Sequence, residues 1–356
     1  MRLGTAVALE VCALSAGVYA AGHGLSRAGA FLLTEARASL RRPLPRATAS
    51  PRDLALPTPG LPEITTSDER TFMGMSDDVL LDRLRREAIV RIKFNRGGSS
   101  ISLRFELADG SRCAFKPTQT NPQTVPRKEV AAFRLDRLLG IGHVSPSAPR
   151  RLSREELEQK LDEQSKGMLP RILNETIFDA SGRTAGEAQF WIPTIKDTEL
   201  ESAAATKIWT EWLSVKAPPP PANRAAVAQH LSTMIVFDLL QNNSDRFSGG
   251  NIVAKPDWSY LYFLDNTFGF QVEPGGHLRC RQALVKVQRF SRSLVARLRT
   301  LDAKMLRDEL AREADPPYEI LSAEEIDSVV ARAHVALEYI DGLIAQFGAE
   351  QVLYFP

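Results

Sequence analysis

The spacing of apolar and polar positions predicts a small β-rich region in the first half of the chain and a mainly helical region in the second. In the first half, Asn95–Ser99 and Asp109-Gly110 are rich in turn-forming residues and separate short runs typical of strands. Apolar residues such as Val130 and Phe133 then recur at helical spacing. These patterns predict a helix at 77–88, strands at 90–94, 100–107 and 112–116, and a helix at 127–139.

Helical periodicity dominates after about residue 150. One strand is expected before the longer helices begin, at 186–192, where Pro193 ends the run. Residues 225–240 are apolar on nearly all sides, which predicts a buried helix. The remaining expected elements are a charged, exposed segment at 154–166, a hairpin formed by 252–254 and 260–264, and helices near 281–299 and 323–347.

The N-terminal residues differ from the rest of the chain. An apolar run that ends near Val18-Tyr19-Ala20 is typical of a signal peptide or signal anchor. Glu10 lies inside the run and is costly to remove from water, so a mobile amphipathic leader is the alternative. Many prolines follow, and they favour an extended linker. We therefore expect a leader at 1–21, a linker at 22–64, and two lobes at 65–193 and 194–356.

Composition and charge narrow the classes of protein. With 356 residues, 44% hydrophobic and 25% charged, the chain is typical of a soluble globular protein with room for two lobes. Its formal net charge of +2 argues against a dedicated nucleic-acid binder. Cys12, Cys113 and Cys280 form no CxxC pair. Cys113 and Cys280 can either pair in an oxidising compartment or remain separate buried thiols, and both alternatives stay open.

A lysine and a glutamate form the first candidate pair. Lys116 lies at the end of a predicted strand, and Glu129 lies at the start of the next predicted helix. Alone, Lys116 is most simply a solvated strand-end lysine. A strand lysine followed by a helix glutamate, however, is the combination that positions nucleotide phosphates in protein kinases. Glu129 could pair with Lys116 or bind a metal ion instead.

Three further polar residues follow in the order typical of phosphoryl-transfer enzymes. Asp245 lies in a loop after the buried helix, with Asn251 six residues later, and Asp265 follows an apolar strand. Phosphoryl transfer needs a carboxylate to orient the attacking hydroxyl, and carboxylate and amide oxygens suit Mg²⁺ or Mn²⁺. The structural alternatives are a polar turn for Asp245 and a helix N-cap for Asp265.

Two weaker signals concern the nucleotide. Gly97 and Gly98 could cover phosphates with backbone N–H groups, although an ordinary hairpin turn explains them equally well. Phe190 and Trp191 lie between the predicted lobes and could stack on an adenine, although core packing is the commoner fate of such aromatics. The histidines are scattered and form no HExxH motif, which argues against a zinc hydrolase. The sequence also has no GxSxG motif and no GxxxxGK[ST] motif, which argues against a nucleophile-elbow hydrolase and a P-loop enzyme.

Taken together, these segments resemble the secretory-pathway atypical kinases, the family of the Golgi casein kinase and four-jointed. The resemblance covers roughly residues 90–345, including a possible interlobe stretch at Gly186–Pro193. Its motifs are Phe115-Lys116-Pro117 with Glu129–Arg137, Phe237-Asp238-Leu239-Leu240 leading to Asp245-Arg246, and Phe263-Leu264-Asp265-Asn266 with Gly269. It implies an α+β, two-lobed protein-kinase-like fold with a small β-rich N-lobe and a mainly helical C-lobe.

The resemblance also implies roles for individual residues. Lys116 would contact nucleotide phosphates, Glu129 would hold the metal or orient Lys116, Asp245 would be the catalytic base, and Asp265 would bind Mn²⁺ or Mg²⁺. The chain would then be a kinase that uses ATP to phosphorylate Ser or Thr hydroxyls of secreted or extracytoplasmic proteins. Its location would be extracytoplasmic, and it would contact membrane only through an N-terminal anchor.

The sequence departs from the family in two respects. Family members usually carry several disulfides, whereas this chain can form at most one outside its leader. The loop Phe247–Ile252 is closer to that of phosphoinositide kinases, which makes Asn251 a candidate second metal ligand and leaves the acceptor open. A sugar-hydroxyl or lipid kinase is therefore one alternative, and a pseudokinase that only binds a partner is another.

Overall fold

The structure is a computed structural model that describes residues 71–248, 250–313 and 316–356. The predicted leader and linker at 1–64 lie outside the described residues. Within the described part of the chain, none of the helices is both long and apolar enough to cross a bilayer. Cys113 and Cys280 are both free and buried.

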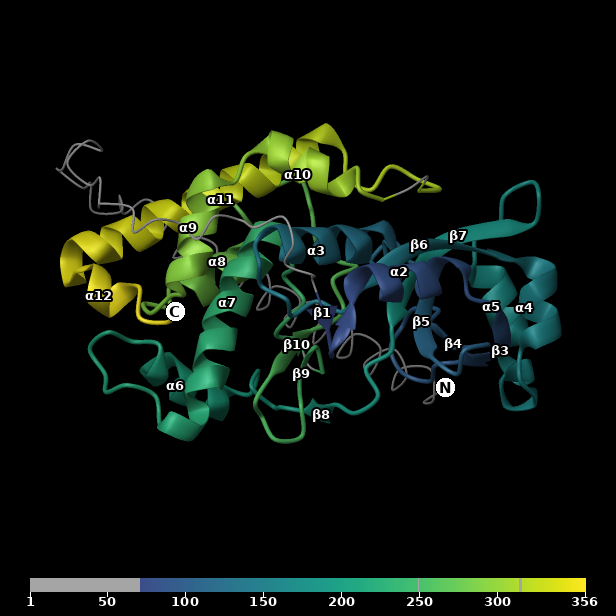
Figure 1. The fold of residues 1–356 in the computed structure, drawn as a ribbon, viewed down its shortest axis with the longest axis horizontal. Coiled ribbons are helices and arrows are strands. Elements are labelled where there is room, and N and C mark those ends of the chain that lie inside the picture. The colour runs from purple at the N-terminus through teal and green to yellow at the C-terminus, as the bar shows by residue number, and fades with distance from the viewer. Residues whose placement is uncertain (1–70, 249, 314–315) are drawn as a thin grey trace, which may run out of the picture. The chain divides into compact units, whose positions relative to one another are not determined.

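A five-stranded antiparallel sheet forms the N-terminal lobe (Figure 1). Its order is β3 (Ile89–Phe94), β4 (Leu103–Leu107), β5 (Arg112–Pro117), β7 (Arg183–Phe190) and β6 (Ser147–Ser153). The small hairpin of β1 (Thr71–Phe72) and β2 (Met75–Ser76) and the helix α2 (Asp77–Arg86) come before it.

Four of these strands were predicted from the sequence, and β6 was not. It completes the sheet beside β7, at the start of the region that was expected to be mainly helical. β6 escaped prediction because Pro149 and two arginines interrupt any apolar alternation. The predicted strand at 186–192 is β7, which begins earlier, at Arg183, and ends at Phe190.

The pleat of the sheet gives its two faces different chemistry. Successive side chains of a strand point to opposite faces. Phe115 stacks on Phe105, with ring centroids 4.8 Å apart, in the core on one face. Its neighbour Lys116 therefore projects from the other face, directly opposite Glu187 of β7 in the strand register.

Helices between the strands complete this lobe. α3 matches the helix predicted at 127–139, whereas the charged segment at 154–166 is split into a short α-helix and a 3₁₀ turn. Leu157 of that segment is buried, so the segment is not fully exposed. The bounds are α3 (Arg127–Leu138), α4 (Arg154–Lys160), η1 (Glu163–Met168) and α5 (Leu169–Glu175).

The C-terminal lobe is built around α7, which is buried on nearly all sides as predicted. The expected hairpin is present, and β8 joins it as a third strand in the order β10-β9-β8. Its first elements are β8 (Lys196–Asp197), α6 (Ala203–Trp212), η2 (Ala222–Arg224), α7 (Ala225–Gln241), β9 (Ile252–Ala254) and β10 (Leu261–Phe263).

The last part of the chain is helical. The single helix expected near 281–299 is two shorter helices, because the connecting residues Val287 and Phe290 are buried in an extended stretch. The long helix near 323–347 is confirmed, and it begins with a capping box formed by Ser322 and Glu325. The bounds are α8 (Leu278–Leu284), α9 (Arg292–Thr300), α10 (Ala303–Leu310), α11 (Ala323–Phe347) and α12 (Ala349–Val352).

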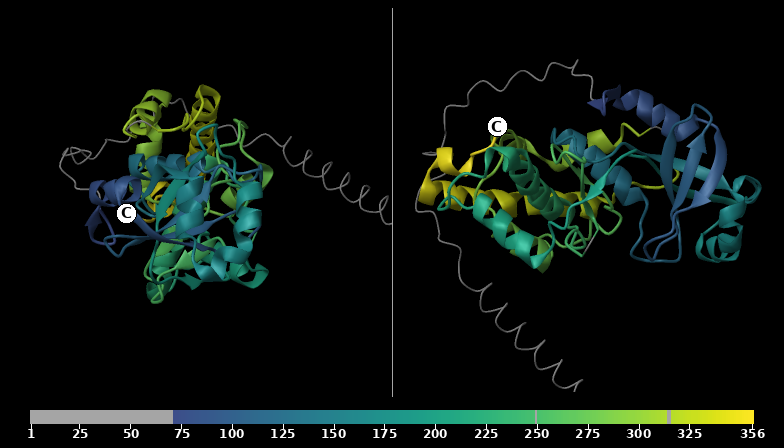
Figure 2. Two further views of the ribbon diagram at one scale, coloured as in Figure 1. Left: turned by 90° about the vertical axis from the view of Figure 1, so that its right-hand side faces the viewer. Right: turned by 90° about the horizontal axis from the view of Figure 1, so that it is seen from below.

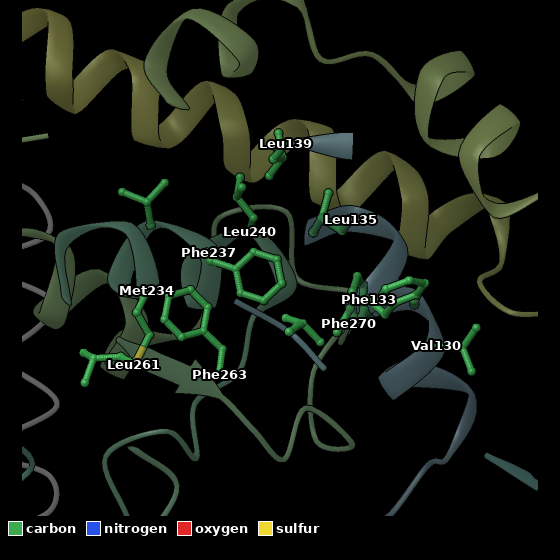
Figure 3. Close-up of a cluster of buried hydrophobic side chains, with 14 of the residues drawn as sticks. Val130, Phe133, Leu135, Leu139, Met234, Phe237, Leu240, Leu261, Phe263 and Phe270 are labelled. Carbon is green, nitrogen blue, oxygen red and sulfur yellow. The ribbon is translucent and has the colours of Figure 1, made fainter. Parts of the chain in front are cut away.

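One hydrophobic core joins the two lobes. Figure 3 shows side chains of α3 facing side chains of α7 and β10, with Phe270 beside them. Phe237 and Phe263 lie with ring centroids 5.9 Å apart, and both are fully buried. Figure 1 shows α3 between the sheet and the helices of the C-terminal lobe, and Figure 2 shows the same ribbon from two further sides. This core holds the start of α3 close to the segment that follows β10.

Candidate active site

The ammonium group of Lys116 lies between two carboxylates that come from distant parts of the sequence. Its Nζ atom is 3.2 Å from Oε1 of Glu129, on α3, and 2.8 Å from Oδ1 of Asp265, after β10. Burial lowers the pKa of Lys116, but Asp265 and Glu129 outweigh it and raise the pKa above its ordinary value. Lys116 is therefore a charged group held between the lobes.

Glu129 is fixed from all sides. Its side chain is fully buried in the first turn of α3. Its Oε1 accepts a hydrogen bond from the backbone N–H of Asn266 at 2.9 Å, and its Oε2 accepts one from the Asn266 side chain at 3.0 Å. Gln189 of β7 donates to the same oxygen at 3.4 Å. The asparagine after Asp265 thus aligns both carboxylates with Lys116.

Asp265 stands where the buried strand β10 leads into a turn. Its backbone φ is +55°, in the left-handed region that aspartate tolerates better than most residues. Thr267 donates a hydrogen bond to Oδ1 at 3.0 Å, and 48% of the Asp265 side chain remains exposed. Lys116 lowers the pKa of this carboxyl and opposes the effect of burial. Asp265 is therefore an ionised carboxylate that is open to a ligand.

The loop after α7 is tied to Asp265 by Asn243. The Asn243 amide nitrogen donates to the backbone carbonyl of Asp265 at 3.1 Å, and its side-chain oxygen accepts from the backbone N–H of Asp245 at 3.1 Å. Asn251 donates to the backbone carbonyl of Asp245 at 3.1 Å and lies 3.5 Å from its Oδ2. One asparagine thus connects the backbones of the two candidate aspartates.

The side chain of Arg246 holds the same loop in place from within the core. It is 1% exposed and pairs with Asp238 of α7 at 3.1 Å. Its guanidinium also donates to Asn266 Oδ1 at 2.7 Å and to the backbone carbonyls of Asn251, at 3.1 Å, and Leu264. Burial raises the pKa of Asp238, although Arg246 opposes the rise. This pair makes the loop a rigid platform for Asp245.

The structure does not bring every predicted site residue together. Gly97 and Gly98 lie in the β3–β4 loop with positive φ values of +136° and +76°, and nothing stands within 4 Å of where a Cβ would be. Phe190 packs edge-on against Phe72 with ring centroids 6.3 Å apart, and Trp191 lies under the Arg104 guanidinium at 5.4 Å. Among the described residues, neither pair forms a hydrogen bond with Lys116, Glu129 or Asp265.

Sequence reasoning missed Glu187. Its side chain is fully buried, and neither carboxyl oxygen has a hydrogen-bond partner among the described residues. Burial raises its pKa well above the ordinary value, and the charges of Glu129 and Asp265 add to the rise while Lys116 opposes it. The available signal was a single acidic residue within the small-residue run Ala185-Gly186-Glu187-Ala188. Asn266 and Gln189 were missed as well.

The carboxylate oxygens at this site suit a metal ion whose remaining ligands come from a bound substrate. Glu129 and Asp265 share the Lys116 ammonium group, and the Glu187 carboxyl stands opposite Lys116 without a hydrogen-bond partner among the described residues. Among the described residues, no cluster of three or more His, Cys, Asp or Glu side chains is arranged to hold a metal ion by itself. Mg²⁺ is usually held by one or two carboxylates together with phosphate oxygens of a substrate. Glu129 and Asp265 fit that pattern.

Comparison with known proteins identifies the fold. No family model matches the sequence, and no curated protein matches it. The chain is similar to a crystal structure of the Golgi casein kinase, with a TM-score of 0.64 and 17% identity over 78% of this chain and 77% of that one. A structure of the same enzyme with Mn/ADP bound gives a TM-score of 0.62 and 17% identity over 78% of each chain.

A third structure, of hydra Fam20 with sugar, gives a TM-score of 0.59 and 17% identity over 77% of this chain and 90% of that one. At this level of identity the likeness shows the fold. The two-lobed, kinase-like α+β fold is therefore confirmed, and so is the resemblance to this family at the level of fold.

Proposed function

We propose that this protein is an ATP-dependent phosphotransferase whose active site lies between the two lobes. The observation that carries the proposal is the ammonium group of Lys116 held between Glu129 and Asp265. The three residues come from a strand, a helix and a post-strand turn, the elements that carry the corresponding groups in protein kinases. The likeness in fold to an enzyme solved with Mn/ADP supports the same conclusion.

Each residue has a role that its surroundings support. Lys116 neutralises phosphate charge, because its pKa keeps it protonated. Asp245 is the catalytic base that orients the acceptor hydroxyl, on a loop that Asn243 and Arg246 hold in place. Gly97 and Gly98 stand in an open loop that can approach phosphates, and Phe190 and Trp191 remain candidates for the adenine side.

Glu129 and Asp265 would hold Mg²⁺ or Mn²⁺, with Asn251 as a candidate further ligand. Their hard oxygen atoms suit either ion. When bound, the ion supplies electrostatic stabilisation of the charge on the transferred phosphoryl group. The protein's own contribution is to orient the carboxylates, and Asn266 does so by binding both oxygens of Glu129 next to Asp265.

The acceptor is proposed to be a Ser or Thr hydroxyl of a protein. A cavity of about 380 Å³ adjoins the Asp245 loop, and its lining includes Ser244 and Ser248 of that loop, Thr206 of α6, Arg279 of α8 and Lys286 just after α8. Its lining also includes apolar side chains such as Trp209, Ile235 and Phe247, so the cavity suits a peptide segment that carries both polar and apolar side chains. A sugar hydroxyl is the second candidate, because this fold is shared with a Fam20 protein solved with sugar.

The proposed location is extracytoplasmic, within the secretory pathway or an equivalent compartment. Likeness in fold to a Golgi enzyme supports it, as does the predicted leader at 1–21. The proposed partners are the protein or glycan substrates, with no nucleic acid and with membrane contact only through an N-terminal anchor. Protease protection of the full-length protein in intact cells or vesicles tests the location.

The test of the activity is transfer of labelled phosphate from ATP by the purified full-length chain to panels of proteins, glycans and lipids. Asp265→Ala should abolish transfer and Asp245→Ala should reduce it by about 100-fold or more, as expected when a group that acts on the transition state is removed. Asp257→Ala, in the exposed β9–β10 turn, is the matched control and should retain activity. Binding of ATP without consumption by the wild type would indicate a pseudokinase instead.

A further inference from the structure

The carboxyl group of Glu187 is buried in the middle of the proposed active site without a partner. Its side chain is 0% exposed, and both oxygens lack a hydrogen bond among the described residues. A buried polar group without a partner is costly to keep in a fold. The residues around Glu187 indicate which group can become its partner.

Glu187 stands opposite Lys116 in the antiparallel register of β5 and β7. Directly opposite residues in such a pair have Cβ atoms about 4.5–5.5 Å apart, so the long Lys116 side chain can reach Glu187 by changing its rotamer alone. The two strands approach closely here, since a Cβ on Gly186 would lie 2.5 Å from the carbonyl oxygen of Lys116. Tyr318 also donates to the Gly186 carbonyl at 3.0 Å.

Lys116 makes no hydrogen bond to Glu187 in the structure, although its ammonium group has three donors and uses two of them on Glu129 and Asp265. These two carboxylates are the ones that the proposed function assigns to a divalent cation. A carboxylate that moves to a dication no longer holds the ammonium group with the same strength. Lys116 would then lose both of its acidic partners just when it has to meet a phosphate.

We propose that Glu187 is a positioning residue that takes over the ammonium group of Lys116 when Glu129 and Asp265 bind the metal–nucleotide complex. This inference rests on the proposed function. In the ligand-free protein the Glu187 carboxyl lies on β7 opposite Lys116 and has no hydrogen-bond partner among the described residues. In the complex, one hydrogen bond from Nζ satisfies it and aims the remaining ammonium hydrogens at the phosphates.

The experiment measures the affinity of the full-length protein for a non-hydrolysable ATP analogue in the presence of Mg²⁺ or Mn²⁺, by titration calorimetry. Glu187→Gln should weaken binding by roughly tenfold, because the amide oxygen can still accept from Nζ but lacks the charge of the carboxylate. In a Lys116→Met background the same substitution should change the affinity by less than about twofold, because its partner is gone. Glu106→Gln is the control, since Glu106 lies on the same face of the sheet and pairs with Arg91.

A second readout uses no nucleotide. Glu187→Met removes an unpaired buried carboxyl while keeping its approximate volume, so the thermal midpoint of the ligand-free variant should rise. Unchanged affinity in Glu187→Gln, equal weakening in both backgrounds, or a lower midpoint in Glu187→Met would each overturn the inference while leaving the proposed function intact. If the wild type binds no metal–nucleotide complex, the proposed function fails and this inference fails with it.

Discussion

Acid should destabilise this protein through two neutral histidines, of which His143 is buried and His230 is half-buried. The ring of His143 lies 4.2 Å from Tyr260 and 4.7 Å from Phe263, and the ring of His230 is 4.3 Å away. Nδ1 of His143 lies 2.6 Å from the Leu261 carbonyl oxygen, which can only accept, so this nitrogen carries the proton. Neither ring has a carboxylate partner among these contacts.

Burial lowers the pKa of both rings. It lowers the pKa of His143 from 6.5 to about 4, with Arg137 adding to the effect and the Leu261 carbonyl opposing it. It lowers the pKa of His230 from 6.5 to about 3, with His143 adding to the effect. Because the unfolded chain binds protons first, this stabilisation is complete above pH 6.5 and is lost as the pH falls towards 4.

The magnitude follows from the same values. A pH of 5 lies 1.5 units below the unfolded pKa of 6.5, while both rings are still neutral in the folded protein. Protonation of the unfolded chain therefore lowers the free energy of unfolding by about 2 kcal/mol for each histidine and by about 4 kcal/mol for the pair. Urea unfolding at pH 7 and pH 5 measures the loss for the wild type and for His230→Phe. The variant should lose about 2 kcal/mol less than the wild type over this interval.

The control for this experiment is His334→Gln, at an exposed position of α11. It should show the same acid-induced loss of stability as the wild type. The reasoning is refuted if His230→Phe and the wild type lose equal stability between pH 7 and pH 5, because His230 would then titrate alike in the folded and unfolded chains.

Two further predictions concern the parts that hold the active site in place. Gly186→Ala would put a Cβ 2.5 Å from the Lys116 carbonyl oxygen and 2.6 Å from the Phe115 ring, so urea unfolding should show a loss of about 1–3 kcal/mol, whereas Gly275→Ala, with no atom within 4 Å, should be neutral. Arg127→Met would remove three hydrogen bonds, to Glu325 at 2.6 and 2.8 Å and to the Ile320 carbonyl at 2.7 Å, that hold the start of α3 beside Glu129. It should lower stability by about 1–3 kcal/mol and weaken ATP binding in calorimetry, and unchanged ATP affinity would show that Glu129 keeps its place without this contact.

The sequence by itself determined the elements whose pattern is local. Turn residues at Asp109-Gly110 and the helical spacing of Val130 and Phe133 specify β5 and α3, because hairpin geometry and helix periodicity depend on neighbouring residues only. The apolar run at 225–240 likewise specified a buried helix. The residue types at Lys116 and Glu129 were sufficient to suggest a phosphate site before any distance was known.

Only the tertiary structure decided which groups meet and what charge they share. β6 joins the sheet through pairing with β7, a long-range contact that Pro149 and its basic neighbours conceal in the sequence. The meeting of Lys116 with Asp265 depends on the packing of α3 against α7 and β10, which brings together residues 149 positions apart. The burial of Glu187 opposite Lys116 depends on strand register, and no local pattern contains register between strands so far apart.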